Sequence, residues 1–345
     1  MTYFLQKVPI AFLTLILVAS MCFALTKLAG EEAAFGEKNP SPEVRAAIMA
    51  KWGMDRPLHE QYFMHMKKLL VLDSMESRKS KQKTLRDVLR EQLPASLRLG
   101  ARAIILALCL GVPIGAMCAV YHNRLPDNAG TLLALMGVSV PSFIFASILM
   151  YVLCSNWNLP GGISWTSMPA IGWDRPTTAF TFSGREFVLL ADMPPGEKGF
   201  SRLAMEEILR FRLWIPAMAL GAFPFAAILR LTRASMLDAL NQDYVRTARA
   251  KGVSAWKVVA RHALRNALTP VVTFMGPVTA GVLTGSLVVE KIFAIPGLGK
   301  FFVDSVNNRD MPLIMGLTVF YSAILIGMNL LVDAVYPILN PRLRR

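Results

Sequence analysis

Charged residues are scarce in this chain of 345 residues, since Asp, Glu, Lys and Arg together make up only 17% of it. A disordered chain or a charged coiled coil needs far more charge, so both classes are excluded. Acidic residues are scarcer than basic ones, 23 against 37, which leaves a net charge of +14. This excess of basic residues is compatible with binding to nucleic acid, anionic lipid or an acidic partner. The positions of the charges along the chain distinguish these possibilities.

Cysteine is also rare, and its positions favour neither a disulfide framework nor a metal site. All four cysteines lie within apolar runs, where cysteine behaves as a small buried hydrophobic residue. They are Cys22, Cys109, Cys118 and Cys154. His59 and His65 have no cysteine or carboxylate cluster around them at ligand spacing, so we expect packed or solvated histidines and no bound metal.

The motifs of a nucleotide-binding enzyme are missing. The nearest stretch to GxxxxGK[ST], residues 297–300, lacks both the first glycine and the hydroxyl residue. No paired carboxylates and no Ser/His or Cys/His set lie close enough in the predicted topology to form a catalytic centre. We therefore expect no catalytic residue, no cofactor bound by this chain and no enzyme activity of its own. A membrane-embedded enzyme or sensor stays as an alternative from another class.

Long apolar stretches are what the chain has in abundance, since residues of the set AVILMFWYC make up 54% of it. Six stretches contain no Asp, Glu, Lys or Arg: residues 8–26, 103–123, 128–173, 213–229, 266–289 and 311–332. A helix needs about 20 mostly apolar residues to cross a bilayer, and each stretch is long enough. A soluble core helix would carry a charge every turn or two. The sequence therefore predicts an all-α polytopic membrane protein with six transmembrane helices.

The first span resembles the apolar part of a cleavable signal, but we expect a retained helix within residues 1–29, because the run is long and five spans follow. Those five are expected at about residues 101–121, 131–154, 213–233, 268–289 and 312–334. Ionisable residues of the membrane part lie only at span ends, which disfavours a proton-coupled carrier. They are Arg230, Arg233, Glu290 and Asp333.

The basic residues predict that both chain ends lie in the cytoplasm. In this orientation 13 Lys and Arg fall in cytoplasmic pieces, including the tail at residues 336–345, against three in the short external loop. The net positive charge of the chain then comes from the excess of Lys and Arg in its cytoplasmic pieces, above all in one basic loop. No nucleic-acid partner is therefore expected.

Two long segments are expected outside the membrane. Residues 30–94 predict a small helical domain, because Ser41 followed by Pro and Glu starts a helix that Gly53 can end. The second segment, residues 156–212, is expected to be a loop-like external insertion whose tryptophans lie at the membrane interface.

The loop at residues 234–267 is the longest cytoplasmic segment and is strongly basic. It predicts two short helices that are broken at Gly252, in a left-handed conformation, and restarted at Ser254. In the first helix, small Ala248 and Ala250 leave a thin helix that fits a groove of another protein, with long charged side chains around it. The candidate docking residues are Asp243, Tyr244, Arg246, Thr247, Ala248, Arg249, Ala250, Lys251, Gly252 and Ser254.

The second short helix carries Lys257, Arg261 and Arg265 at i, i+4 and i+8. A basic stripe opposite an apolar one is typical of a helix at the lipid headgroup boundary. For these three residues, attraction to anionic lipid and binding to a protein partner both remain open.

Several segments together resemble one family. RTARAKG followed by RHALRNALTP closely resembles the cytoplasmic EAA loop of ABC-importer permeases, in the version of the oligopeptide, dipeptide and nickel uptake family. The same family order continues through GMDRPLHEQY, QLPASLRLG, IPAMALG, VVEKIFAIPGLG, RDMP and LLVDAVYPILNPRLR. The departures are Arg246-Thr247-Ala248 for the general Glu-Ala-Ala, Asn340 for the usual Asp, and a longer segment at residues 156–212.

The resemblance implies a type I (MetI-like) ABC-importer core over residues 95–335, with an external domain after the first span. It implies a permease subunit in the bacterial inner membrane that imports oligopeptides or dipeptides. Nickel chelates, opines, glycosides and antimicrobial peptides stay as alternative substrates. The implied partners are a second permease, giving a heterodimer, two ATPase subunits that carry ATP and Mg²⁺, and a periplasmic or lipid-anchored binding protein. The external loop of this family corresponds here to Glu290, Pro296, Gly297 and Gly299.

Overall fold

The computed structural model describes most of the chain. The described residues are 2–28, 41–53, 55–70, 77, 83–154, 157–159, 163–165, 179–182, 185–188 and 214–339. The tail beyond residue 339, with the Asn340 departure, and most of the insertion at 156–212 lie outside the described residues.

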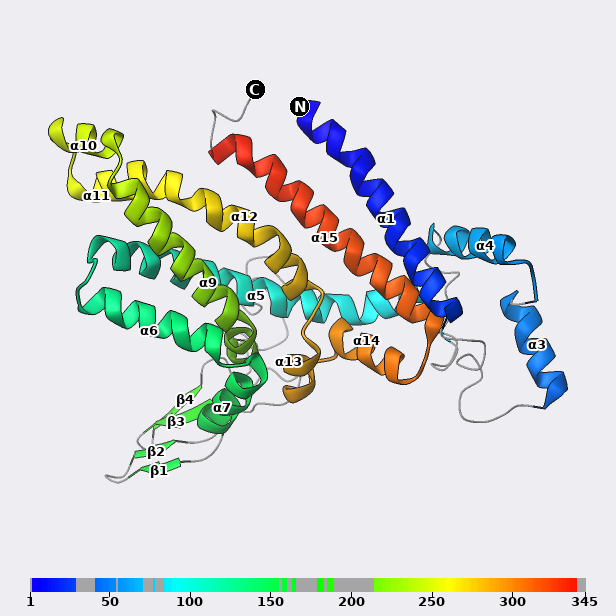
Figure 1. The fold of residues 1–345 in the computed structure, drawn as a ribbon. Helices are drawn as coiled ribbons and strands as arrows, with labels where there is room; N and C mark the ends of the chain where they lie inside the picture. The colour runs from blue at the N-terminus through cyan, green and yellow to red at the C-terminus, as the bar shows by residue number, and fades with distance from the viewer. Residues whose placement is uncertain are drawn as a thin grey trace, which may run out of the picture.

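A bundle of long helices forms the body of the molecule (Figure 1). Helix α9 (Trp214–Leu240) lies at its centre and has its most extensive contact with α5 (Leu85–Val120). Around α9 lie α6 (Leu125–Ser139), α7 (Ser142–Cys154) and α12 (Leu264–Leu283). At one edge, α1 (Thr2–Leu28) packs against α15 (Met311–Leu339). Their Lys7 and Asp333 side chains form an ion pair at 2.6 Å.

Five helical segments are long and apolar enough to cross a membrane: Lys7–Leu28, Leu85–Val120, Trp214–Leu240, Ala255–Ile292 and Met311–Val335. A sixth span requires α6 and α7 together, which are bent by 109°. The span expected at 131–154 therefore consists of two helices in the structure. The break comes from Pro141, which disfavours a helical conformation at the preceding residue, and Val140 is accordingly extended, with φ −87° and ψ 118°.

Helix α5 begins earlier than the span expected at 101–121, and the domain boundary drawn between residues 94 and 95 lies inside it. Its start is set by a capping box. The Asp87 backbone N–H donates to Thr84 Oγ1 at 3.2 Å, and the Thr84 N–H donates to the Asp87 carboxylate at 3.0 Å. A local pair of polar residues thus starts a helix of 36 residues, which carries a charged first half before its apolar second half.

The fifth expected span, 268–289, is shorter in the structure, because α12 ends at Leu283 and the chain turns at Gly285 with φ +96°. Two short helices follow, α13 (Leu287–Ile292) and α14 (Leu298–Asn307). Gly285 serves this turn, and a Cβ on it would lie 2.9 Å from the Gly299 N and from Ser96 Oγ, so the turn also packs against α14 and α5. At Gly281 an added Cβ would meet nothing within 4 Å.

Two glycines four residues apart in α5 bring it close to α9. A Cβ on Gly111 would lie 3.1 Å from the Phe225 carbonyl oxygen, and one on Gly115 would lie 2.6 Å from that of Leu229. Both contacts join α5 to α9, so the two glycines permit the closest packing of the bundle.

The segment that follows the first span contains α3 (Pro42–Trp52) and α4 (Leu58–Leu70). As expected, Pro42 lies in the first turn of α3, and Gly53 ends the helix with φ 65°. His65 packs against Phe23 of α1 and bonds the Gln61 carbonyl oxygen at 2.7 Å, whereas His59 is exposed. The structure thus packs one of these histidines against α1 and exposes the other.

The insertion was expected to be loop-like, and this is corrected by four short strands. They are β1 (Trp157–Leu159), β2 (Ile163–Trp165), β3 (Ala179–Phe182) and β4 (Arg185–Val188). They pair antiparallel in the order β1-β2-β3-β4. Runs such as Ala-Phe-Thr-Phe and Arg-Glu-Phe-Val favour strands, because aromatic and β-branched side chains fit a pleated surface. The all-α expectation holds for the membrane-spanning part.

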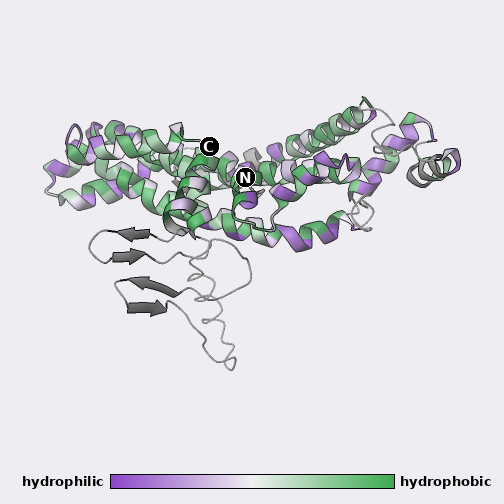
Figure 2. Ribbon diagram, turned by 90° about the horizontal axis from the view of Figure 1, so that it is seen from below, coloured by the Kyte–Doolittle hydropathy of each residue, from purple (hydrophilic) through white to green (hydrophobic). Residues whose placement is uncertain are grey.

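Hydrophobic residues dominate the long helices (Figure 2). Many large apolar side chains face outward, among them Leu13 of α1, Leu132 of α6 and Tyr151 of α7, each at least 60% exposed. A soluble monomer rarely exposes so much apolar surface, whereas a bilayer covers it.

Candidate functional site

The predicted docking loop continues directly from the central helix. α9 ends at Leu240, two residues form a turn, and α10 (Asp243–Ala250) begins. Backbone bonds close this turn, from the Gln242 N–H to the Ala239 carbonyl oxygen at 3.2 Å and from the Arg246 N–H to the Gln242 carbonyl oxygen at 3.3 Å. In Figure 1, α10 lies at the same end of the bundle as the first residues of α1 and the last turns of α15. We call this the α10 end.

Helix α10 has one buried and one exposed face. Val245 and Ala248 are buried, and they share an apolar cluster with Met236 and Ala239 of α9 and Ala119 of α5. The other predicted docking residues of the loop are exposed: Asp243, Tyr244, Arg246, Thr247, Arg249, Ala250, Lys251, Gly252 and Ser254. A polar outer face is therefore held on an apolar base.

This arrangement corrects the role expected for Ala248. The sequence interpretation counted it among the residues that keep α10 thin for a groove in another protein. In the structure its side chain is only 7% exposed and packs inside the chain itself. A small side chain fits there because α10 packs against the turn at Val258–Ala263, whereas Ala250 is exposed as a docking residue would be.

Gly252 joins the two short helices in the left-handed conformation that the sequence predicted, with φ +75°. The Val253 N–H donates to the Ala248 carbonyl oxygen at 3.2 Å, which closes α10. An added Cβ at Gly252 would meet nothing within 4 Å. Backbone conformation alone therefore requires glycine at this position.

After Ser254 the chain forms α11 (Ala255–Lys257) and then a π-helical turn, η3 (Val258–Ala263), before α12. Lys257, Arg261 and Arg265 are all exposed, as the basic stripe requires. On the expected apolar side Val258 and Ala263 are buried, but Ala255 is exposed. The sequence pattern did not indicate the π-turn, because i, i+4 spacing alone does not distinguish it from an α-helix.

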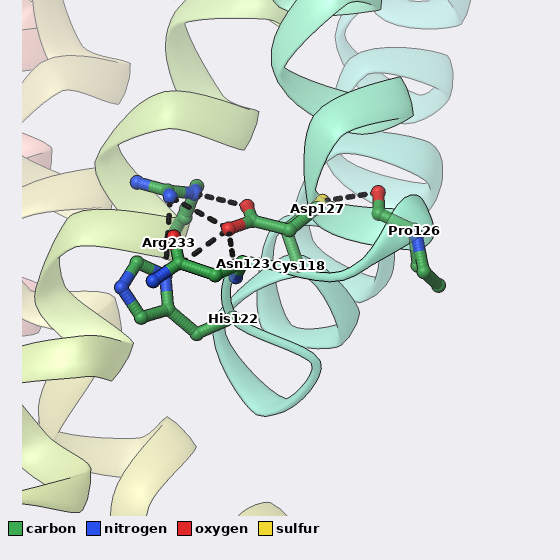
Figure 3. Close-up of polar contacts among 6 residues, drawn as sticks. All are labelled: Cys118, His122, Asn123, Pro126, Asp127 and Arg233. Carbon is green, nitrogen blue, oxygen red and sulfur yellow. Dashed lines mark hydrogen bonds and ion pairs between the residues drawn. The ribbon is translucent and has the colours of Figure 1, made fainter.

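An ion pair that the sequence analysis missed joins α6 to α9 near the α10 end (Figure 3). Arg233 Nε contacts Asp127 Oδ1 at 2.5 Å, and Nη2 donates to Oδ2 at 2.8 Å. The Asn123 N–H also donates to Oδ2 at 2.9 Å, and His122 Nδ1 lies 3.0 Å from it. Asp127 is 1% exposed, so this two-point contact is shielded from water on the carboxylate side.

One signal for this pair was present in the sequence. Asp127 is an acidic residue in a short loop between two spans, and Arg233 stands at the end of a third. Only the fold brings these residues, 106 positions apart, together.

A second polar cluster lies at the opposite end of the bundle, beside α13 and α14 (Figure 1), which we call the α14 end. Glu290, expected in an external loop, is fully buried. Ser96 Oγ donates to its Oε1 at 2.7 Å, and the Lys300 N–H donates to Oε2 at 3.0 Å. Ser96 Oγ also accepts a bond from the Leu298 N–H at 2.9 Å. The motifs QLPASLRLG and VVEKIFAIPGLG, far apart in the sequence, therefore meet at one carboxylate.

The glycines of this loop make room for the carboxylate. A Cβ on Gly297 would overlap the Glu290 carboxylate, and one on Gly299 would lie 3.1 Å from Oε2. Gly297 and Gly299 are buried, while Pro296 is exposed. The carboxylate accepts bonds at the first turn of α14, where a negative charge is favoured by the helix dipole. The α14 end is thus a packed internal scaffold.

Comparison with known proteins adds family information to this geometry. A family model described as "Binding-protein-dependent transport system inner membrane component" matches residues 111–345. That range includes α9, α10, α12, α13 and α14, and therefore both polar clusters apart from Ser96.

Individual relatives match nearly the whole chain. It is 37% identical to the dipeptide transport system permease protein DppB of Bacillus subtilis, over 96% of this chain and 94% of the relative. It is 36% identical to DppB of Escherichia coli, over 90% and 88%. It is 33% identical to the oligopeptide transport system permease protein OppB of Escherichia coli, over 99% and 97%.

Proposed function

We infer that this chain, which belongs to the family of binding-protein-dependent transport system inner membrane components, is the permease subunit of an ATP-driven importer of peptides. It is a multi-pass protein of the bacterial inner membrane. The observation that carries the peptide assignment is the identity to dipeptide and oligopeptide permeases, at 33–37% over at least 90% of the chain.

The exposed face of α10 is the docking element for an ATPase subunit. Its charged and polar side chains face outward, while its base packs on α9 and α5. Because one turn joins α10 to a helix that runs through the membrane, a push on α10 is passed to the bundle as a rigid movement. Stiff coupling of this kind requires short connections, which the bonds of Gln242 and Gly252 provide.

The chain works with a second permease of the same kind, two ATPases and a periplasmic or lipid-anchored binding protein. The α10 end faces the cytoplasm. This orientation is supported by the excess of basic residues in the pieces that would lie inside. The ATPases bind ATP and Mg²⁺, and this chain supplies the path and the coupling contact.

Uptake in cells tests this function. Deleting the gene should abolish uptake of labelled dipeptides or oligopeptides, and expression of the chain from a plasmid should restore it. Co-purification of the tagged chain should recover two ATPase chains and a second permease. Unchanged peptide uptake, together with loss of uptake of a nickel chelate, an opine or a glycoside, would move the protein to another substrate of the same architecture.

A further inference from the structure

Helix α6 is held to α9 at two levels. At its start, Asp127 makes the two-point contact with Arg233 of α9 (Figure 3). Further along, a Cβ on Gly137 would lie 2.8 Å from Ala226 Cβ and 2.9 Å from the Ala222 carbonyl oxygen, so the two helices touch closely there as well. α6 and α9 can therefore move as one body.

After α6 the chain changes direction. It leaves the helix at Val140, and α7 starts at Ser142 with a bend of 109°. Since Pro141 provides no backbone N–H, the chain there lacks one of the bonds that make a helix stiff. α6 is thus held to α9 along its length, and the break at Pro141 separates it from α7.

The ion pair also lies next to the base of α10. Met236, one turn after Arg233 on α9, belongs to the apolar cluster that buries Val245 and Ala248 of α10. Ala116 and Ala119, at the last turns of α5 before the α5–α6 turn, belong to the same cluster. A displacement of α10 is therefore passed through this cluster to α9, which carries Arg233, and to the end of α5, which leads into α6 and Asp127.

We propose that Asp127 and Arg233 are positioning residues of the coupling unit: their contact makes α6 move with α9 when an ATPase pushes α10. The assignment rests on the proposed function. A buried ion pair adds little net stability compared with apolar packing, but it fixes one relative position of the groups that carry it. His122 and the Asn123 N–H hold the carboxylate from the other side, so the position is defined by the α5–α6 turn as well.

The test uses the assembled importer in lipid vesicles, with Asp127→Asn, Arg233→Gln and the double variant. We measure peptide taken up per ATP hydrolysed and the amount of assembled complex. This ratio should fall about tenfold in each variant, within the range typical of coupling between sites. The double variant should be no worse than the singles, because both remove the same contact. Arg233→Lys keeps the charge but not the two-point geometry, so it should lower the ratio by less.

The matched control is the Lys7–Asp333 pair, which joins α1 to α15, two helices that contribute no residue to the apolar cluster of Val245 and Ala248. Lys7→Gln and Asp333→Asn should leave the ratio unchanged. An unchanged ratio in the Asp127 and Arg233 variants would overturn the proposal, and so would uptake and hydrolysis that fall in parallel as the complex is lost. A wild-type complex that hydrolyses ATP but takes up no peptide would instead contradict the proposed function.

Discussion

The exposed loop at the α10 end and the cluster at the α14 end use polar residues in opposite ways. At the α10 end the charged side chains of the loop are exposed on an apolar base. At the α14 end a carboxylate is buried and receives bonds from a hydroxyl and backbone N–H groups. The first arrangement leaves the charged groups accessible to another molecule. In the second, hydrogen bonds within the chain satisfy the buried carboxylate. Family motifs occur at both ends, so motif likeness alone does not separate a docking surface from a scaffold.

The glycines show the same contrast. Gly252 has open space around it and is required for its positive φ, whereas Gly297 has ordinary backbone angles and is required because its neighbour fills the space. Substitutions should therefore act on conformation at one end and on packing at the other.

The largest loss of stability should come from Gly297→Ala. The new methyl group overlaps the Glu290 carboxylate and must displace it from its hydrogen bonds, at a cost of about 3 kcal/mol. The measurement is the thermal unfolding midpoint in detergent. Gly281→Ala is the control, since its Cβ would meet nothing within 4 Å. Equal midpoints for the two variants would contradict the scaffold role of the α14 end.

A smaller loss is expected from Ala248→Leu, which overfills the cluster beneath α10 and costs about 2 kcal/mol. Ala250→Leu lies on the exposed face of the same helix and should leave stability unchanged. Co-purification of the ATPase subunits with each variant separates the two roles. If Ala248→Leu keeps full stability and loses only ATPase binding, the small side chain of Ala248 instead serves to fit α10 into a groove of the ATPase.

The smallest loss of stability belongs to Gly252→Val, with a strain of about 1–2 kcal/mol from a β-branched residue at positive φ. Peptide uptake should nevertheless be abolished while the protein still inserts in the membrane, because the joint between α10 and α11 changes. Gly252→Asn is the control, since asparagine tolerates this conformation. Normal uptake by the valine variant would show that the joint takes no part in coupling.

Much of the architecture could be predicted from local sequence. The apolar stretches give the spanning helices, Gly53 ends α3, and Gly252 adopts the predicted left-handed conformation. The size of the bend at Pro141 and the short strands of the insertion could not be predicted as well. Pro141 marks a local break, but an angle of 109° between α6 and α7 depends on how these helices pack on α9.

At the sites, the sequence predicted which residues of α10 belong to the docking loop but not which way each one faces. Ala248 was placed with the docking residues and is buried, and Glu290 was placed in an external loop and is buried too. A helix of eight residues has a face that is decided by what it packs against, which no local pattern records.

Composition and local motifs were enough to predict the membrane-spanning class, the family resemblance and the loop that carries the basic charge. Only helix packing brings Asp127 to Arg233 and Ser96 to Glu290. Both contacts join residues that are about a hundred or more positions apart. A buried carboxylate requires hydrogen-bond partners, but which partners reach it depends on helix packing, and this depends on all the helices at once.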